Sequence, residues 1–245
     1  MKVSLFITCL ADQLFPEVGV SVVRVLKKLG CEVDFPAAQV CCGQPAFNSG
    51  FSQEARKVAR ALIDAFEHSE YVVSPSGSCV GMIRHYYGEL FRDDPELAER
   101  AARFAAKTYE FSQFLVQVLR VEDLGVRFPE RVTYHASCHG SRLLGIRDEP
   151  LRLLSNIDEM DFVPLRRCED CCGFGGTFSV KLADVSAAMV DEKIDQITET
   201  GADYVVSTDL GCLMNIAGRC ERRELPIQTL HLAEILDRAE SGEKS

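Results

Sequence analysis

Short apolar runs alternate along the chain with stretches in which apolar residues recur every three or four positions. In the first part of the chain, the runs at 3–8, 32–35 and 71–74 predict buried strands. The stretches between them predict two helices, one that ends at Gly30 and one that Ser52 caps. Strands that alternate with helices are typical of an α/β fold with a mostly parallel sheet.

The same alternation returns in the second part of the chain. Strands are predicted at 132–136, 161–164 and 204–207, with a last strand near 227–229. The helices of this part are expected near 149–156, from Ala183 to a stop at Gly201, and from about Leu232 to Arg238.

A helical connector is predicted between these two parts. Residues 94–120 read as helix, with Asp94 as a cap and Pro95 in the first turn. The expected organisation is a first half-domain at 1–93, a helical connector at 94–128 and a second half-domain at 129–245, with a polar, frayed tail from Glu240.

Both halves carry the same cysteine pattern: one cysteine, then Cys-Cys-Gly, then a last cysteine. The gaps are 31 and 36 residues in the first half and 32 and 39 in the second, and Tyr71 and Tyr204 each precede the last cysteine by eight positions. Such agreement indicates an internal repeat. We therefore predict two pseudo-symmetric half-domains, each a small, mostly parallel sheet flanked by helices. The matched cysteines are Cys9, Cys41, Cys42 and Cys79, followed by Cys138, Cys171, Cys172 and Cys212.

The position of these cysteines favours metal chemistry. Each follows a predicted strand or precedes a helix, so the loops of one half converge at the carboxyl edge of its sheet. Four thiolates per half match the ligand requirement of a [4Fe–4S] cluster. Adjacent cysteines such as Cys41 and Cys42 suit a single zinc ion less well, because its ligands are usually about two to four residues apart. We predict one [4Fe–4S] centre per half, with a zinc-stabilised module as the alternative.

Three further cysteines, Cys31, Cys168 and Cys220, have no counterpart in the repeat. Cysteine is often buried as a small apolar residue, and we interpret all three in this way. Cys168 stands three residues before Cys171 and could instead serve as a spare or exchanging thiol.

His135 and His139 flank Cys138 in the second half, which allows a histidine ligand or a Cys–His nucleophile. The first half gives this alternative no support, because it has no histidine around Cys9. The glycines of 173–176 lack the spacing of a phosphate loop, so we expect them to let the backbone pack close to a cluster.

Composition narrows the function further. The chain has 245 residues and a net charge of −10 without a basic cluster, which argues against nucleic acid as a partner. Eleven cysteines without a secretion signal favour metal or redox chemistry in the reducing cytoplasm over disulfides. Apolar runs are too short to cross a bilayer, so no transmembrane segment is predicted.

Four stretches resemble a known family: Cys41–Gly50, Ser74–Cys79, Cys171–Lys181 and Gly211–Ile216. They resemble the cysteine-rich CCG domain that is found in heterodisulfide reductase and in the iron–sulfur subunits of glycolate and glycerol-3-phosphate oxidation. The closer resemblance, over nearly the whole chain, is to the lactate utilization protein A family. It implies a cytoplasmic iron–sulfur subunit that acts with two companion proteins, one of them ferredoxin-like, in oxidising L-lactate to pyruvate.

One departure from the broader CCG pattern affects the expected cluster. That pattern ends each half in Cys-x-x-Cys, whereas Met82 and Asn215 stand at the last position here. Ordinary four-cysteine centres are therefore expected, in a subunit that transfers electrons and has no assigned catalytic residue. The alternative is a self-sufficient redox enzyme that acts on a thiol, a disulfide or a 2-hydroxy acid.

Overall fold

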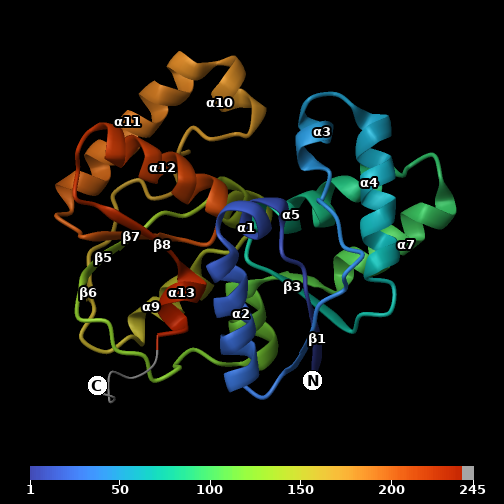
Figure 1. Ribbon diagram of the computed structural model, residues 1–245, viewed down its shortest axis with the longest axis horizontal. Coiled ribbons are helices and arrows are strands. Elements are labelled where there is room, and N and C mark those ends of the chain that lie inside the picture. The colour runs from blue at the N-terminus through green and yellow to red at the C-terminus, as the bar shows by residue number, and fades with distance from the viewer. Residues whose placement is uncertain (239–245) are drawn as a thin grey trace. The chain divides into compact units, whose positions relative to one another are not determined.

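The computed structural model describes residues 1–238, so the tail predicted from Glu240 lies outside the described residues. The chain divides into two compact units, of which the first is Met1–Phe111 and the second begins at Ser112. Each unit contains a four-stranded sheet in which all paired strands are parallel (Figure 1). The predicted α/β fold of two repeated halves is confirmed.

The first unit alternates strands with helices as predicted. Its elements are β1 (Lys2–Leu5), α1 (Cys9–Leu14), α2 (Pro16–Lys28), β2 (Glu32–Asp34), α3 (Gln44–Asn48), α4 (Ser52–Ala65), β3 (Tyr71–Ser74), α5 (Gly77–Gly81), the π-helical turn η1 (Met82–Tyr86), α6 (Tyr87–Leu90), α7 (Pro95–Ala106) and β4 (Thr108–Glu110).

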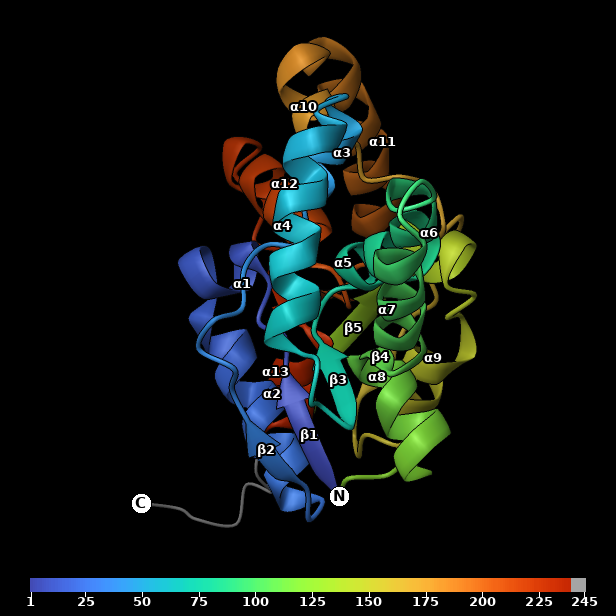
Figure 2. The ribbon, with the colours of Figure 1, turned by 90° about the vertical axis from the view of Figure 1, so that its right-hand side faces the viewer.

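The first sheet has the strand order β2-β1-β3-β4, with Val3 between Val33 and Tyr71. Figure 2 shows β1 and β3 with their arrowheads pointing the same way, toward α1 and α5. Because crossovers between parallel strands are right-handed, the reversal of strand order at β1 puts helices on both faces. Figure 1 shows α2 on one side of β1 and β3 and α4 and α7 on the other.

Glycine and cap positions set the helix ends in this unit. Gly30 has a φ of +79° and donates its N–H to the Lys27 carbonyl, so α2 stops where the sequence predicts. The predicted cap of α4 is wrong. Ser52 is the first helical residue rather than the cap, and Phe51 occupies the cap position without a side-chain hydrogen bond; its carbonyl accepts from the Ala55 N–H.

The second unit repeats this order. After the boundary helix α8 (Phe111–Gln113) it contains the π-helical segment η2 (Phe114–Leu119), β5 (Arg131–Tyr134), the π-helical turn η3 (His139–Leu143), α9 (Asp148–Ser155), β6 (Asp161–Phe162), α10 (Thr177–Lys181), α11 (Ala183–Glu199), β7 (Tyr204–Ser207), α12 (Leu210–Arg222), β8 (Gln228–His231) and α13 (Leu232–Leu236).

The second sheet has the order β6-β5-β7-β8, which is the first order repeated. Figure 1 shows α11 and α12 on one side of these strands and α9 and α13 on the other. The Gly201 stop after α11 is confirmed, since Gly201 has a φ of +64° and donates its N–H to the Thr198 carbonyl.

The predicted helical connector is only partly a helix. Asp94 caps α7 as expected, accepting the Leu97 N–H at 3.1 Å. The single helix predicted for 94–120 is wrong, however, because β4 follows α7 and pairs with β3 as the fourth strand of the first sheet. Thr108 and Glu110 are buried on either side of half-buried Tyr109, which suits a strand better than a helix.

Apolar cores lie directly under the cysteine loops. In the first unit Phe66 packs on Phe6 and on Phe104, with ring centroids 5.8 Å apart in both pairs. Cys42 and Cys79 belong to this core. Cys172 and Cys212 likewise pack into the core of the second unit, with side chains from α11 and α12. Burial of one such aromatic or aliphatic side chain contributes about 1.5–3 kcal/mol, so these cores fix the loops firmly.

Within residues 1–238, no helix is both long enough and apolar enough to cross a membrane.

Candidate metal centres

Strand ends bring the four predicted cysteines of the first unit together. Cys9 opens α1 just beyond β1, and Cys79 lies in α5 just beyond β3, where its N–H donates to the Ser76 hydroxyl at 3.3 Å. Cys41 and Cys42 occupy the loop between β2 and α3. The three loops meet at the carboxyl edge of the sheet, as expected for a parallel α/β fold.

The four sulfurs of the first unit form one connected group, which we call the first thiol set. The Sγ atoms of Cys9 and Cys41 lie 3.8 Å apart, and those of Cys42 and Cys79 lie 3.3 Å apart. Cys41 and Cys42 join the two pairs through a thiol hydrogen bond. Cys42 and Cys79 are buried, Cys41 is half-buried and Cys9 is exposed, so the set extends from the core to the surface.

Hydrogen bonds polarise the thiols of this set. Hydrogen bonds with the Cys42 and Cys9 thiols lower the pKa of Cys41 to about 3 despite its partial burial. The same bonds, followed by burial, raise the pKa of Cys9 and Cys42. The set therefore shares one thiolate at Cys41. Because metal ligation needs every ligating thiol deprotonated, metal binding would release protons.

The second unit forms an equivalent group, the second thiol set, from Cys138, Cys171, Cys172 and Cys212. Hydrogen bonds link Cys171 to Cys138 and Cys172, and Cys172 to Cys212. They lower the pKa of Cys171 to about 2, with the bond to Cys138 contributing most. Cys172 and Cys212 are buried, and Cys138 and Cys171 are half-buried.

A glycine fixes each pair of adjacent cysteines. The N–H groups of Gly43 and Gly173 donate to Cys41 Sγ at 3.4 Å and to Cys171 Sγ at 3.3 Å. Both glycines have a left-handed φ, +82° and +83°. A Cβ at Gly173 would lie 2.7 Å from the Ser186 carbonyl oxygen, so glycine permits close packing of this loop on α11. The expected close approach of the backbone to a cluster stays a prediction.

A side-chain hydrogen bond, which the sequence did not reveal, holds the backbone carbonyl of the second cysteine in each adjacent pair. The Tyr87 hydroxyl donates to the Cys42 carbonyl at 2.9 Å, and the Asn215 amide donates to the Cys172 carbonyl at 2.7 Å. Asn215 stands where the broader CCG pattern has its last cysteine, and the matching Met82 is fully buried. The sequence signal that could have indicated this difference is the alignment of the two halves, which places Tyr87 opposite Cys220 and Met82 opposite Asn215.

The unmatched cysteines lie outside the two thiol sets. Cys31 is buried at the amino end of β2, and Cys220 is buried two turns beyond Cys212 in α12. Cys168 is half-buried three residues before Cys171. The interpretation as buried apolar residues agrees with the positions of Cys31 and Cys220, whereas Cys168 is only partly buried.

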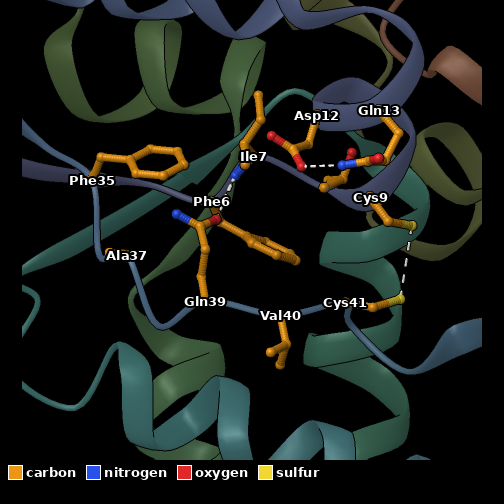
Figure 3. Close-up of a pocket in the computed structure, with 11 residues that line it drawn as sticks. Phe6, Ile7, Cys9, Asp12, Gln13, Phe35, Ala37, Gln39, Val40 and Cys41 are labelled. Carbon is orange, nitrogen blue, oxygen red and sulfur yellow. Dashed lines mark hydrogen bonds between the residues drawn. The ribbon is translucent and has the colours of Figure 1, made fainter.

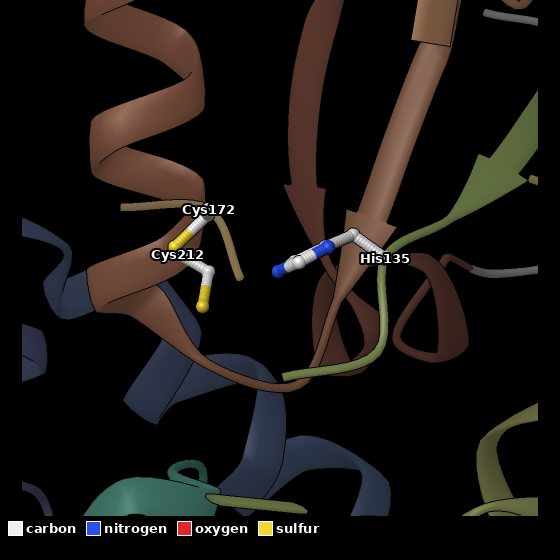
Figure 4. Close-up of side chains that lie close together, drawn as sticks. All are labelled: His135, Cys172 and Cys212. Atoms are coloured by element: carbon white, nitrogen blue, oxygen red, sulfur yellow. The ribbon is translucent and has the colours of Figure 1, made fainter. Parts of the chain in front are cut away.

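His135 joins the second thiol set, whereas the structure gives His139 no comparable place. One imidazole nitrogen of His135 and the Sγ atoms of Cys172 and Cys212 all lie within 4.8 Å of one another. Figure 4 shows the ring pointing from the end of β5 toward the two thiols. Burial, together with the Lys193 charge, lowers the pKa of His135 to about 3, so the imidazole is neutral.

A cavity of about 240 Å³ adjoins the exposed side of the first thiol set. Cys9 and Cys41 line one end, and Ile7, Phe35 and Gln39 line the other (Figure 3). The Gln39 side chain is fixed there, since it accepts the Ile7 N–H at 2.9 Å and donates to the Leu5 carbonyl at 3.1 Å. The cavity therefore lies against the surface side of this thiol set.

Four thiols from three loops are soft donors that suit zinc, copper(I) or iron–sulfur clusters. Sulfurs bonded at about 2.3 Å around one tetrahedral ion lie about 3.8 Å apart, close to the Cys9–Cys41 separation. By donor type the set suits a four-iron cluster or a single zinc ion, and this sulfur separation is that of a single tetrahedral ion.

Known proteins resemble this chain in sequence or in fold. The sequence model of the cysteine-rich domain family CCG matches residues 3–84 and 132–217. Lactate utilization protein A of Bacillus licheniformis is 54% identical over 97% of this chain and 99% of its own, and that of Geobacillus thermodenitrificans is equally similar. A hypothetical protein from Helicobacter pylori has the same fold, with a TM-score of 0.68 at 13% identity, and this chain covers 49% of it. The chain belongs to the cysteine-rich CCG domain family and, within it, to the lactate utilization protein A family.

Proposed function

We propose that each thiol set holds a [4Fe–4S] centre and that the chain is an electron-transfer subunit in the oxidation of L-lactate to pyruvate. The carrying observation is the convergence of four thiols at the same sheet edge in both units. Lactate comes from the name of the relatives. The eight proposed ligands are Cys9, Cys41, Cys42, Cys79, Cys138, Cys171, Cys172 and Cys212.

Adjacent cysteines favour the cluster over zinc. Besides each other, the Cys41 and Cys42 thiols contact different partners, Cys9 at the surface and Cys79 in the core. A cluster with several irons can take both as ligands to different metals, whereas a single ion would need both at one centre.

Such a centre takes up and releases electrons when it is bound. The chain's own residues hold it and limit its contact with water. Cys42 and Cys79 close the core side, and Tyr87 and Gly43 orient the Cys-Cys backbone. Exposed Cys9 leaves one side of the first set open to a redox partner.

Two companion lactate-utilization proteins, one of them ferredoxin-like, complete the proposed pathway for electrons. We place the chain in the cytoplasm as part of this proposal, because all eleven cysteines are free thiols and a reducing compartment keeps them so.

The test is an assay of the cluster-loaded chain with L-lactate and an artificial acceptor, alone and with both companions added. Turnover should require the companions, because four thiolates saturate a four-iron cluster and leave no iron for substrate. With Cys42→Ser or Cys172→Ser, turnover by the assembled proteins should be lost. An assembly that oxidises lactate at the full rate without this chain would contradict the proposal.

A self-sufficient redox enzyme is the second candidate, favoured by the cavity beside Cys9 and Cys41. The same assay separates the two functions. Lactate oxidation by the chain alone that is lost in Cys42→Ser would support the enzyme and overturn the subunit.

A further inference from the structure

His135 is a buried polar side chain without a well-formed hydrogen bond. It is fully buried, and neither imidazole nitrogen has a hydrogen-bond partner of normal geometry in the described part of the chain; the Cys168 backbone acts on the ring only outside that geometry. Its backbone is held rigidly, because its N–H donates to the Val206 carbonyl at 2.8 Å as a continuation of the β5–β7 pairing. An unpaired buried polar group destabilises a folded protein, so its retention points to a partner absent from the protein atoms.

The first unit shows that the fold itself does not need a histidine at this position. Three residues before the first cysteine of each set stand Phe6 and His135. Phe6 is buried and packs edge-on against Phe66, with ring centroids 5.8 Å apart. An apolar ring therefore satisfies this position in the first unit, and the histidine marks a difference in chemistry between the two units.

A second buried difference lies on α11. Lys193 stands seven residues beyond Ser186, whose carbonyl packs on Gly173, and Leu62 stands seven beyond Ala55, whose carbonyl packs on Gly43. Both side chains are buried, but Lys193 is an ammonium that donates to the Arg167 carbonyl and the Gln196 amide oxygen. Its charge acts on Cys172 and on His135. The second thiol set thus has a polar, positively charged surrounding where the first has Phe6 and Leu62.

We propose that His135 donates a hydrogen bond from its imidazole N–H to sulfur of the group held at Cys172 and Cys212, and thereby raises the reduction potential of the second centre. The proposal rests on the iron–sulfur assignment above. Cluster sulfides and thiolates are hydrogen-bond acceptors, and such bonds are among the factors that set cluster potentials. Ligation by the imidazole is not needed, because the four thiolates already saturate a four-iron cluster.

The experiment uses the full chain, reconstituted anaerobically, with Cys42→Ser in the background so that only the second centre remains. Three variants are compared in that background: His135→Phe, which copies the first unit, His135→Gln, which keeps a neutral donor, and His139→Gln as the matched control beside Cys138. Iron and sulfide are assayed first. The reduction potential is then titrated by electron paramagnetic resonance, and pulsed spectra are recorded on protein with ¹⁵N-labelled histidine.

A histidine nitrogen coupling should appear in the reduced second centre and disappear in His135→Phe. The equilibrium constant for its reduction should fall about tenfold, or about 59 mV for one electron. His135→Gln should recover most of the potential, and His139→Gln should keep both signals.

Full iron loading with unchanged coupling and potential in His135→Phe would overturn the inference, as would an equal shift in His139→Gln. Loss of the centre in both His135 variants would also overturn it, because a ligand rather than a hydrogen-bond donor would have been removed. A starting protein that holds no iron would instead refute the proposed function, so the two failures are distinguishable.

Discussion

Asn215 donates a hydrogen bond from its side-chain amide to the carbonyl oxygen of Cys172 at 2.7 Å. The bond joins α12 to the Cys-Cys-Gly loop across 43 residues of sequence. In the first unit Tyr87 makes the equivalent bond to Cys42 from a position one turn further along the chain. The two units thus hold the same carbonyl with different side chains, and each unit can be loosened separately.

Asn215→Ala should therefore weaken the second centre and leave the first intact. Loss of the amide strands a carbonyl in a buried loop, which costs about 1–3 kcal/mol. Unfolding of the metal-free chain in urea and the rate of iron loss to a chelator would measure this. Asn156→Ala is the control, because Asn156 donates to the Arg152 carbonyl at an exposed helix end and its removal should matter little. Equal effects of the two changes would contradict the role given to Asn215.

Gly173→Ala should disrupt the second thiol set more severely than Gly43→Ala disrupts the first. The added Cβ would lie 2.7 Å from the Ser186 carbonyl in the former and 3.3 Å from the Ala55 carbonyl in the latter. Gly50→Ala isolates backbone strain, since Gly50 has a φ of +84° and nothing within 4 Å of the added Cβ. It should cost only about 1–2 kcal/mol. Iron bound per chain would be measured for the three variants, and its loss should be largest in Gly173→Ala, smaller in Gly43→Ala and smallest in Gly50→Ala. Full loading of Gly173→Ala would show that the close packing is dispensable.

The thiol pKa values predict an unusual alkylation profile for the metal-free chain. Because the pKa of Cys41 is about 3, its thiolate persists as pH falls from 7 to 5, and its rate should stay nearly constant over that range. Cys9 is more exposed, but its pKa is raised, so its rate should fall about tenfold per pH unit. Mass spectrometry of iodoacetamide-treated peptides would measure both rates. A steep profile at Cys41 would contradict the shared thiolate.

Cys42→Ser and Cys172→Ser should each remove one centre, whereas Cys31→Ser and Cys220→Ser should leave both. Cys31 lies at the amino end of β2, away from the loops that carry the thiols, and Cys220 lies two turns from Cys212. Iron and acid-labile sulfide per chain would be compared for the four variants. Similar iron loss from all four would mean that the cysteines have been sorted wrongly.

Sequence patterns predicted the repeat, the same alternating order of strands and helices in both halves, and the loops that carry the thiols. Each of these depends on local periodicity or on spacing. Two local predictions failed. Ser52 is a residue type that often caps helices, yet the chain is already helical there. The strand β4 has only three residues, so the sequence pattern did not reveal it within the helix predicted at 94–120.

The features that distinguish the two units depended on contacts distant in sequence. Tyr87 and Asn215 reach carbonyls 45 and 43 residues away, and no local pattern indicates such a bond. His135 was visible as a candidate, but the absence of a histidine around Cys9 argued against it. In the structure that same asymmetry becomes informative, because Phe6 fills the matching position with an apolar ring.

Metal content of the anaerobically purified and reconstituted chain tests the central claim most directly. Two four-iron centres predict about eight irons and about eight acid-labile sulfides per chain, falling to half in Cys42→Ser or in Cys172→Ser. Zinc bound without acid-labile sulfide would contradict the account.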